Sequence, residues 1–181
     1  MDNGLLNHDL KHCPNCKSFF SQIKRHFDYL FDQYSFQLVY CEDSEQFPIC
    51  LVVLESADCR LRFISDREVP EFSIGTKSAR ITWEDSDRGT VHGWYGLNAL
   101  ADFLEKRTIH APFLEQRKVG YLTREEHLVR ISDLLRPRCD LVFEFMRQEV
   151  FEQRWEEFAN FLVERRKETL EQIRRRYPGQ L

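Results

Sequence analysis

The sequence has few residues of the kind that build long linkers, and it lacks a long apolar run. Glycine occurs seven times and proline six times in 181 residues, so long flexible connections are not expected. The longest apolar run, Ile49 to Leu54, is far shorter than the roughly 20 residues that a membrane-spanning helix needs. The first ten residues include Asp2 and have no apolar run, which does not fit a signal peptide. We therefore expect a cytoplasmic protein without a membrane segment.

A basic excess and the common catalytic motifs are also missing. The net charge is −4 and the pI is about 5.9, which argues against a dedicated nucleic-acid binder because such domains carry many extra basic residues. The sequence contains no nucleophile elbow, no glycine-rich phosphate loop and no paired-histidine zinc motif. We identify no candidate catalytic residues, and this favours a non-enzymatic protein.

The sequence does contain enough apolar and aromatic side chains for a folded domain. Apolar residues make up 42% of the chain and charged residues 31%, which predicts a sizeable core under a solvated surface. Strand patterns are concentrated between residues 36 and 74, with further candidates at 80–83 and 90–94. Short turns between them favour antiparallel pairing. The four main strands are expected at Phe36–Cys41, Ile49–Glu55, Cys59–Ser65 and Val69–Ile74.

The alternation of side chains assigns faces to these strands. In the first strand, strict alternation places Cys41 on the face opposite Leu38. The second strand is apolar on both faces, which predicts a central position in the sheet. Pro70 lacks an N–H donor, so the fourth strand is expected to be short or to lie at an edge.

Helical patterns lie on both sides of the strands. Apolar residues recur at three- and four-residue spacing over 17–34 and again over 97–107. The run Thr123–Glu126 matches a capping box that begins a helix, and Pro137 ends it. A longer helix is expected over 138–176. The sequence thus predicts an α+β fold, in which helices pack on an antiparallel sheet of four to six strands and a long C-terminal helix follows.

These patterns also suggest a division of the chain. Residues 1–16 are mostly polar and are interpreted as a flexible leader. Residues 17–120 contain all the strand patterns and form the expected α+β domain. Residues 121–181 form the expected helical C-terminal segment.

A pair of cysteines forms a candidate metal site. Cys13 and Cys16 have the C-x-x-C spacing at which two thiolates bind one Zn²⁺. The chain has no second such pair, but His12 and His26 are near enough in sequence to complete a Cys₂His₂ site. Two alternatives stay open: a redox pair, although no strand precedes it, and two free cysteines in a mobile leader. Three further cysteines lie within strand patterns and are interpreted as buried free thiols: Cys41, Cys50 and Cys59.

Arginine and tryptophan residues form a candidate partner-binding surface. Arg60 and Arg62 alternate with apolar residues, so both are expected to point outward. Guanidinium groups bind carboxylates and phosphates, although the same alternation is typical of a solvated outer face. Trp83 and Trp94 flank an acidic loop, where aromatic side chains form either a recognition patch or a cap on the sheet.

Part of the chain resembles a known pattern. The residues that carry it are Phe27, Leu30, Phe31, Tyr34 and Phe36, then Val52, Glu55, Ser56, Arg60, Leu61, Arg62, Phe63, Asp66 and Arg67, and finally Trp94 to Leu97 with Phe103 and Leu104. In this order they resemble a family of small uncharacterised bacterial proteins over residues 27–104. The resemblance implies a shared α+β fold and no activity. An association with toxin–immunity gene clusters suggests an immunity-type role.

Two main functional hypotheses follow, and a third, a small enzyme whose site has no recognisable motif, stays open. In the first, the chain is a bacterial, non-enzymatic protein-interaction module of the immunity or regulatory type. It would bind a protein partner through the sheet or the C-terminal helix, or form a homodimer through that helix. In the second, the chain is a zinc-binding protein with a structural N-terminal Cys/His site, and Zn²⁺ is then its cofactor.

Overall fold

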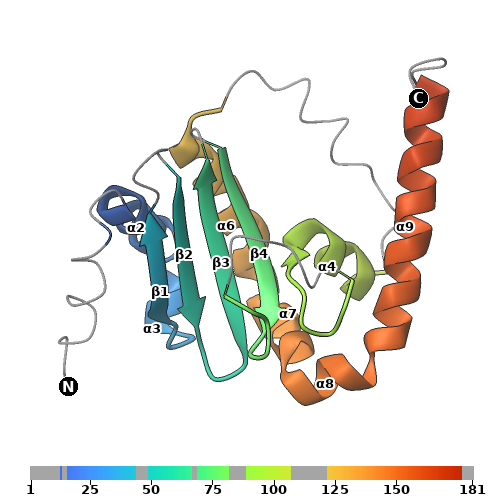
Figure 1. Ribbon diagram of the computed structural model, residues 1–181, viewed down its shortest axis with the longest axis horizontal. Helices are drawn as coiled ribbons and strands as arrows, with labels where there is room; N and C mark the ends of the chain where they lie inside the picture. The colour runs from blue at the N-terminus through green and yellow to red at the C-terminus, as the bar shows by residue number, and fades with distance from the viewer. Residues whose placement is uncertain are drawn as a thin grey trace.

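A computed structural model describes residue 13 and residues 16–43, 49–66, 69–81, 89–106 and 122–176. These residues form a five-stranded antiparallel sheet with helices (Figure 1). The α+β fold class predicted from the sequence is confirmed. Each strand pairs with the next one along the chain, and the connections between the first four strands are short, which favours such pairing. The strands are β1 (Gln37–Asp43), β2 (Cys50–Glu55), β3 (Cys59–Asp66), β4 (Val69–Thr76) and β5 (Tyr95–Gly96).

Helices precede and follow the strands. Among them, α6 begins at the predicted capping box, where the Thr123 N–H donates to the Glu126 carboxylate at 2.7 Å and the Glu126 N–H donates to Thr123 Oγ1 at 3.3 Å. This prediction is confirmed. The helices are α2 (Cys16–His26), α3 (Asp28–Asp32), α4 (Leu97–Leu104), α6 (Arg124–Leu135), a 3₁₀ turn (Arg136–Arg138), α7 (Cys139–Met146), α8 (Gln148–Gln153) and α9 (Trp155–Arg176).

Two of the expected helices are interrupted. The helix predicted over 17–34 is divided into α2 and α3 at Phe27. The helix predicted over 138–176 is divided into α7, α8 and α9, because Arg147 has an extended ψ of 133° and Arg154 leaves the helical region. These breaks turn the chain back, so that Phe151 and Phe158 are fully buried. The long terminal helix is therefore α9 alone, about 33 Å in length at 1.5 Å per residue.

The two faces of the sheet are covered differently. Helices α2, α6 and α7 lie behind the sheet in Figure 1, and the main core lies between them and the strands. A smaller apolar cluster lies on the opposite face and contains Leu51, Val53, Ala79 and Trp94. Strand β2 contributes to both clusters, as its two apolar faces predict. It is an interior strand, although β3 is the middle one of the five.

The later strands differ from the expected ones. Residues 80, 81 and 90–94 are not in a strand, and residues 82 and 83 lie outside the described ranges. The fifth strand is β5, directly after the predicted candidate. Its pairing with β4 is at Ser73 and Ile74. Pro70 lies in the first half of β4, where it is opposite Ser65 of β3.

A β-bulge in β1 determines the direction of Cys41. Leu38 pairs with Leu54 and Tyr40 pairs with Val53, so one extra residue lies between the two pairs. Cys41 then pairs with Val52 on the helix-covered face. The prediction that Cys41 faces away from Leu38 is wrong, because strict alternation does not hold across a bulge.

The main core also includes the two cysteines of the expected leader. Cys13 is 3% exposed and Cys16 is fully buried. The same core contains buried residues of the expected C-terminal segment, such as Leu128 and Val142. The two ends of the described chain therefore share one core with the sheet.

Candidate metal centre

Four cysteines gather where the start of α2 packs on β1 and β2. Cys16 is the first residue of α2, Cys41 lies in β1, and Cys50 is the first residue of β2. The sulfur atoms of these three residues all lie within 4.8 Å of one another. Tetrahedral Zn²⁺ with Zn–S bonds of about 2.3 Å holds its sulfur ligands about 3.8 Å apart. Three cysteine side chains therefore converge closely enough to reach a single metal ion when all three are reduced.

Cys13 is the fourth member of this cysteine cluster. Its thiol donates to the Cys41 carbonyl oxygen at 2.9 Å, and the Cys41 side chain is a further hydrogen-bond partner. The backbone N–H of Cys16 donates to the Cys13 carbonyl at 3.1 Å, which closes the C-x-x-C turn. The motif thus places its two side chains toward the same part of the β1–β2 hairpin.

The register of the hairpin brings the other two cysteines together. Cys41 is opposite Val52 and Cys50 is opposite Asp43, so the two cysteines are diagonal neighbours on the helix-covered face. Because of the bulge in β1, this face is also the one on which α2 packs. Sequence reasoning missed Cys41 and Cys50 as members of the site. The predicted hairpin, with one cysteine at each side of its turn, was the signal that could have identified them.

Two of the four cysteines are covalently linked. Cys16 and Cys50 form a disulfide with a Cα–Cα distance of 5.5 Å, while Cys13 and Cys41 are reduced thiols. The separation is typical of unstrained disulfide positions. The cluster therefore contains one oxidised pair and two further thiols.

The surroundings of the cluster affect thiol ionisation. Burial is the main cause that raises the pKa of Cys13, and the charges of Asp43 and Glu42 raise it further. Such a thiol is protonated near neutral pH unless a cation replaces the proton. A bound dication near Cys13 would therefore favour the ionised form of this thiol.

The remaining two cysteines are isolated from this cluster. Burial raises the pKa of Cys139 to about 12 and also raises the pKa of Cys59. The Cys139 thiol donates to the Leu135 carbonyl of the preceding helix at 3.5 Å. These are ordinary buried thiols, and they provide matched controls for the four clustered ones.

The histidines expected to complete the site are not brought to the cysteines within the described residues. His26 lies at the opposite end of α2 from Cys16, and its Nε2 is 3.0 Å from Glu125 Oε1. Ten helical residues correspond to about 15 Å. His12 lies outside the part of the chain that the structure describes.

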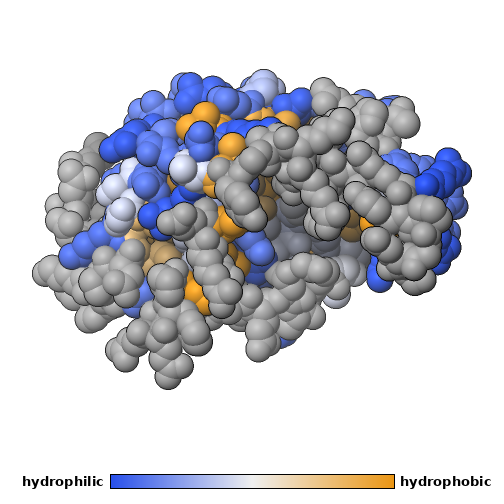
Figure 2. All heavy atoms as spheres, turned by 90° about the horizontal axis from the view of Figure 1, so that it is seen from above, coloured by the Kyte–Doolittle hydropathy of each residue, from blue (hydrophilic) through white to orange (hydrophobic). Residues whose placement is uncertain are grey.

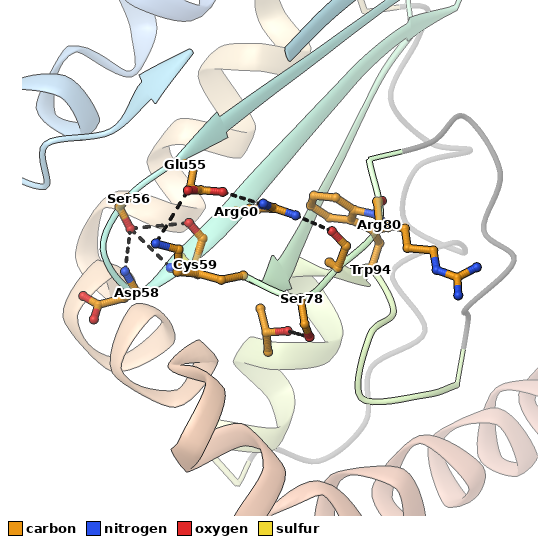
Figure 3. Close-up of polar contacts among 11 residues, drawn as sticks. Glu55, Ser56, Asp58, Cys59, Arg60, Ser78, Arg80 and Trp94 are labelled. Carbon is orange, nitrogen blue, oxygen red and sulfur yellow. Dashed lines mark hydrogen bonds and ion pairs between the residues drawn. The ribbon is translucent and has the colours of Figure 1, made fainter. Parts of the chain in front are cut away.

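Arg60 and Trp94, two of the expected partner-binding residues, are involved in contacts within the fold (Figure 3). Arg60 binds Glu55 Oε2 at 2.5 Å and the Ala79 carbonyl at 2.7 Å. Trp94 donates its indole N–H to the Arg80 carbonyl at 2.8 Å and is 7% exposed. Both residues help to hold the segment after β4 against the sheet.

Arg62 is more enclosed than alternation predicts. Its side chain is on the face away from the helices, but it is only 4% exposed. Its guanidinium lies over the Trp94 ring, and its Nε donates to Ser73 Oγ at 3.0 Å. The expectation of an outward, solvated arginine is therefore corrected, because the ring of Trp94 covers the Arg62 side chain. Trp83 lies outside the described ranges.

A groove lies between α9 and the region of β5 and α4. Its volume is about 440 Å³. Seen from above, the end of the molecule that carries α9 is mainly hydrophilic where it is described (Figure 2). The described lining of the groove is mainly apolar and includes Arg166. Its lining residues are Gly89, Trp94, Tyr95, Gly96, Ala99, Trp155, Ala159, Leu162, Val163 and Arg166.

Comparisons with known proteins do not add a function. No family model matches the chain, and no curated protein or solved structure is significantly similar to it. In the described part of the chain, no helix has both the length and the apolar character required to cross a membrane. The function is therefore argued from the geometry of the cysteine cluster and the groove.

Proposed function

We propose that this protein binds one structural Zn²⁺ through Cys13, Cys16, Cys41 and Cys50. The observation that carries the proposal is the convergence of three sulfurs within 4.8 Å, with the Cys13 thiol against Cys41. Four thiolates around one ion are typical of structural zinc sites, which have no open position for a substrate. Soft sulfur ligands in this number also favour zinc over magnesium or calcium.

The metal would fasten the start of α2 to the β1–β2 hairpin. Two ligands belong to the C-x-x-C turn and two to the strands, so one ion would cross-link segments that are far apart in sequence. Metal binding to such a site contributes directly to the free energy of folding. A reducing compartment such as the cytoplasm would keep the four thiols available.

Metal analysis of the full chain tests this proposal. Protein purified under reducing conditions should contain about one equivalent of Zn²⁺, as expected for a single tetrahedral site. The Cys41→Ser and Cys50→Ser variants should lose most of the metal, whereas the matched Cys139→Ser control should retain it. Reduced protein that binds no stoichiometric Zn²⁺ after reconstitution would contradict the proposal.

A histidine variant separates this site from the Cys₂His₂ alternative. His26→Gln should retain the metal, because His26 pairs with Glu125 rather than with the sulfur cluster. If His26→Gln lost the metal while Cys41→Ser retained it, the ligand set with His12 and His26 would be supported instead. The two variants together therefore identify the ligands.

A second proposed function is protein interaction through the groove beside α9. The apolar lining includes Trp155, Ala159 and Leu162, and Arg166 also lines the groove. Arg166 is exposed and, among the described residues, has no carboxylate partner. We propose as occupant a protein segment with an apolar side chain next to a carboxylate, because these two groups complement the apolar lining and the guanidinium. An immunity-type or regulatory protein would use such a surface.

Selection from a random peptide display library tests the groove. Peptides with apolar and acidic residues should be enriched on the wild-type chain, and Ala159→Trp should abolish their binding by filling the groove. Asn160→Trp is the matched control, because Asn160 is exposed on the same helix and does not line the groove. Peptides that bind both variants equally would exclude the groove. A doubled mass in light scattering, lost in Ala159→Trp, would instead identify a second copy as the partner.

A further inference from the structure

We infer that the cysteine cluster is a redox switch in which oxidation of Cys16 and Cys50 to a disulfide releases the bound Zn²⁺. This inference rests on the proposed zinc site and adds its regulation. The same two side chains belong both to the disulfide and to the group of three neighbouring sulfurs. The site can therefore exist as a tetrathiolate or as a disulfide beside two reduced thiols.

The backbone supports both states without rearrangement. The Cα–Cα distance of Cys16 and Cys50 is 5.5 Å, which is within the usual range for disulfides, about 4.4–6.8 Å. In a tetrahedral zinc site the sulfur atoms of two cysteine ligands are about 3.8 Å apart, so the same two backbone positions can also direct both sulfurs to one ion. A change of state would then require only side-chain rotation and loss of the metal.

The oxidation can be written as a balanced two-electron reaction with a peroxide. One thiolate attacks a peroxide oxygen, so that an S–O bond forms, the O–O bond breaks and hydroxide leaves. The second thiolate attacks the oxidised sulfur, so that the S–S bond forms, the S–O bond breaks and a second hydroxide leaves. Two protons from solvent convert the hydroxides to water. The sulfur pair loses the two electrons that the peroxide gains.

The release of zinc follows from the loss of two ligands. After oxidation, the ion would keep only Cys13 and Cys41, which is half of a tetrahedral set. Cys41 is only half-buried, so solvent reaches the edge of the cluster and the ion has a route out. The Cys16–Cys50 bond spans 34 residues and still ties α2 to β2, so the fold would persist after the metal has left.

The experiment treats the reduced, zinc-loaded full chain with hydrogen peroxide. A colorimetric chelator should register one Zn²⁺ released for each disulfide formed, and peptide mapping should locate that disulfide at Cys16–Cys50. The Cys139→Ser control should behave like the wild type. A dithiol reductant and added Zn²⁺ should restore the starting state, and the oxidised protein should unfold at a higher temperature than the reduced, metal-free protein.

Several results would overturn the switch. Retention of Zn²⁺ after full oxidation of the pair, or release accompanied by a Cys13–Cys16 link or by sulfinic acid, would contradict it while leaving the zinc site intact. A reduced chain that never binds Zn²⁺ would overturn the zinc site and the switch together. The metal content before oxidation therefore distinguishes the two failures.

Discussion

The guanidinium of Arg62 lies 4.9 Å from the centre of the Trp94 ring, and both side chains are almost fully buried. Arg62 belongs to the middle strand, whereas Trp94 belongs to the segment that returns to the sheet before β5. A buried cation against an aromatic face is stabilising because the ring replaces part of the lost hydration. The pair thus fixes Trp94 to the face of the sheet opposite the one on which α2, α6 and α7 pack.

The first prediction concerns this pair. Arg62→Ala should reduce the free energy of unfolding by about 2–3 kcal/mol, because it removes the ring contact and a charged hydrogen bond to Ser73. Arg62→Lys should recover only part of this loss, because lysine lacks a planar group that can stack on the ring and donate a hydrogen bond at the same time. Chemical denaturation measures both effects.

Arg130 provides the control for Arg62. It is exposed on α6, so Arg130→Ala should change the free energy of unfolding by less than about 0.5 kcal/mol. Equal, small effects of the two substitutions would show that Arg62 behaves as a solvated surface residue.

The second prediction concerns the pH dependence of stability. Hydrogen bonds from the Thr123 backbone and side chain lower the pKa of Glu126. The unfolded chain therefore binds a proton more readily than the folded chain, and stability rises with pH in this range. The contribution is present above the ordinary glutamate pKa and is lost as pH falls through the lowered folded value. Glu126→Gln should flatten this part of the profile of melting temperature against pH.

The exposed Glu168 is a suitable control for the pH measurement, because it lies on α9 outside any capping box. Glu168→Gln should leave the acidic part of the profile unchanged. If Glu126→Gln and the wild type lost stability in parallel as pH fell, the capping carboxylate would have no role in acid sensitivity.

The third prediction concerns the attachment of α9. Phe158 is fully buried and its ring contacts those of Tyr95, Phe103, Phe145 and Phe151. Phe158→Ala should cost about 3–5 kcal/mol, as large-to-small changes in a packed core do. Leu170→Ala, further along the same helix at a site 38% exposed, should cost less than about 1 kcal/mol. Similar costs at both positions would mean that the first half of α9 is not anchored in the core.

Local patterns predicted much of the fold. The four main strands and the capping box of α6 were identified because alternation, turns and caps depend on neighbouring residues. The helix breaks at Arg147 and Arg154 were not identified, because neither position has a proline or glycine that would indicate a break. There the burial of Phe151 and Phe158 determines the path, and such packing depends on residues distant in sequence.

Only the part of the candidate site that depends on neighbouring residues was predicted. The C-x-x-C spacing of Cys13 and Cys16 is local and was recognised. The inclusion of Cys41 depends on a single extra residue in β1, which reverses the face of every side chain after it. Alternation alone therefore placed this cysteine on the wrong side of the sheet and left histidines as the apparent ligands.

X-ray absorption at the zinc K-edge of the reduced full chain is the measurement that tests the proposed centre most directly. Four sulfur neighbours at about 2.3 Å should fit the spectrum, because all four ligands would be thiolates. A first shell that contains nitrogen at about 2.0–2.1 Å would contradict the tetrathiolate and favour histidine ligands.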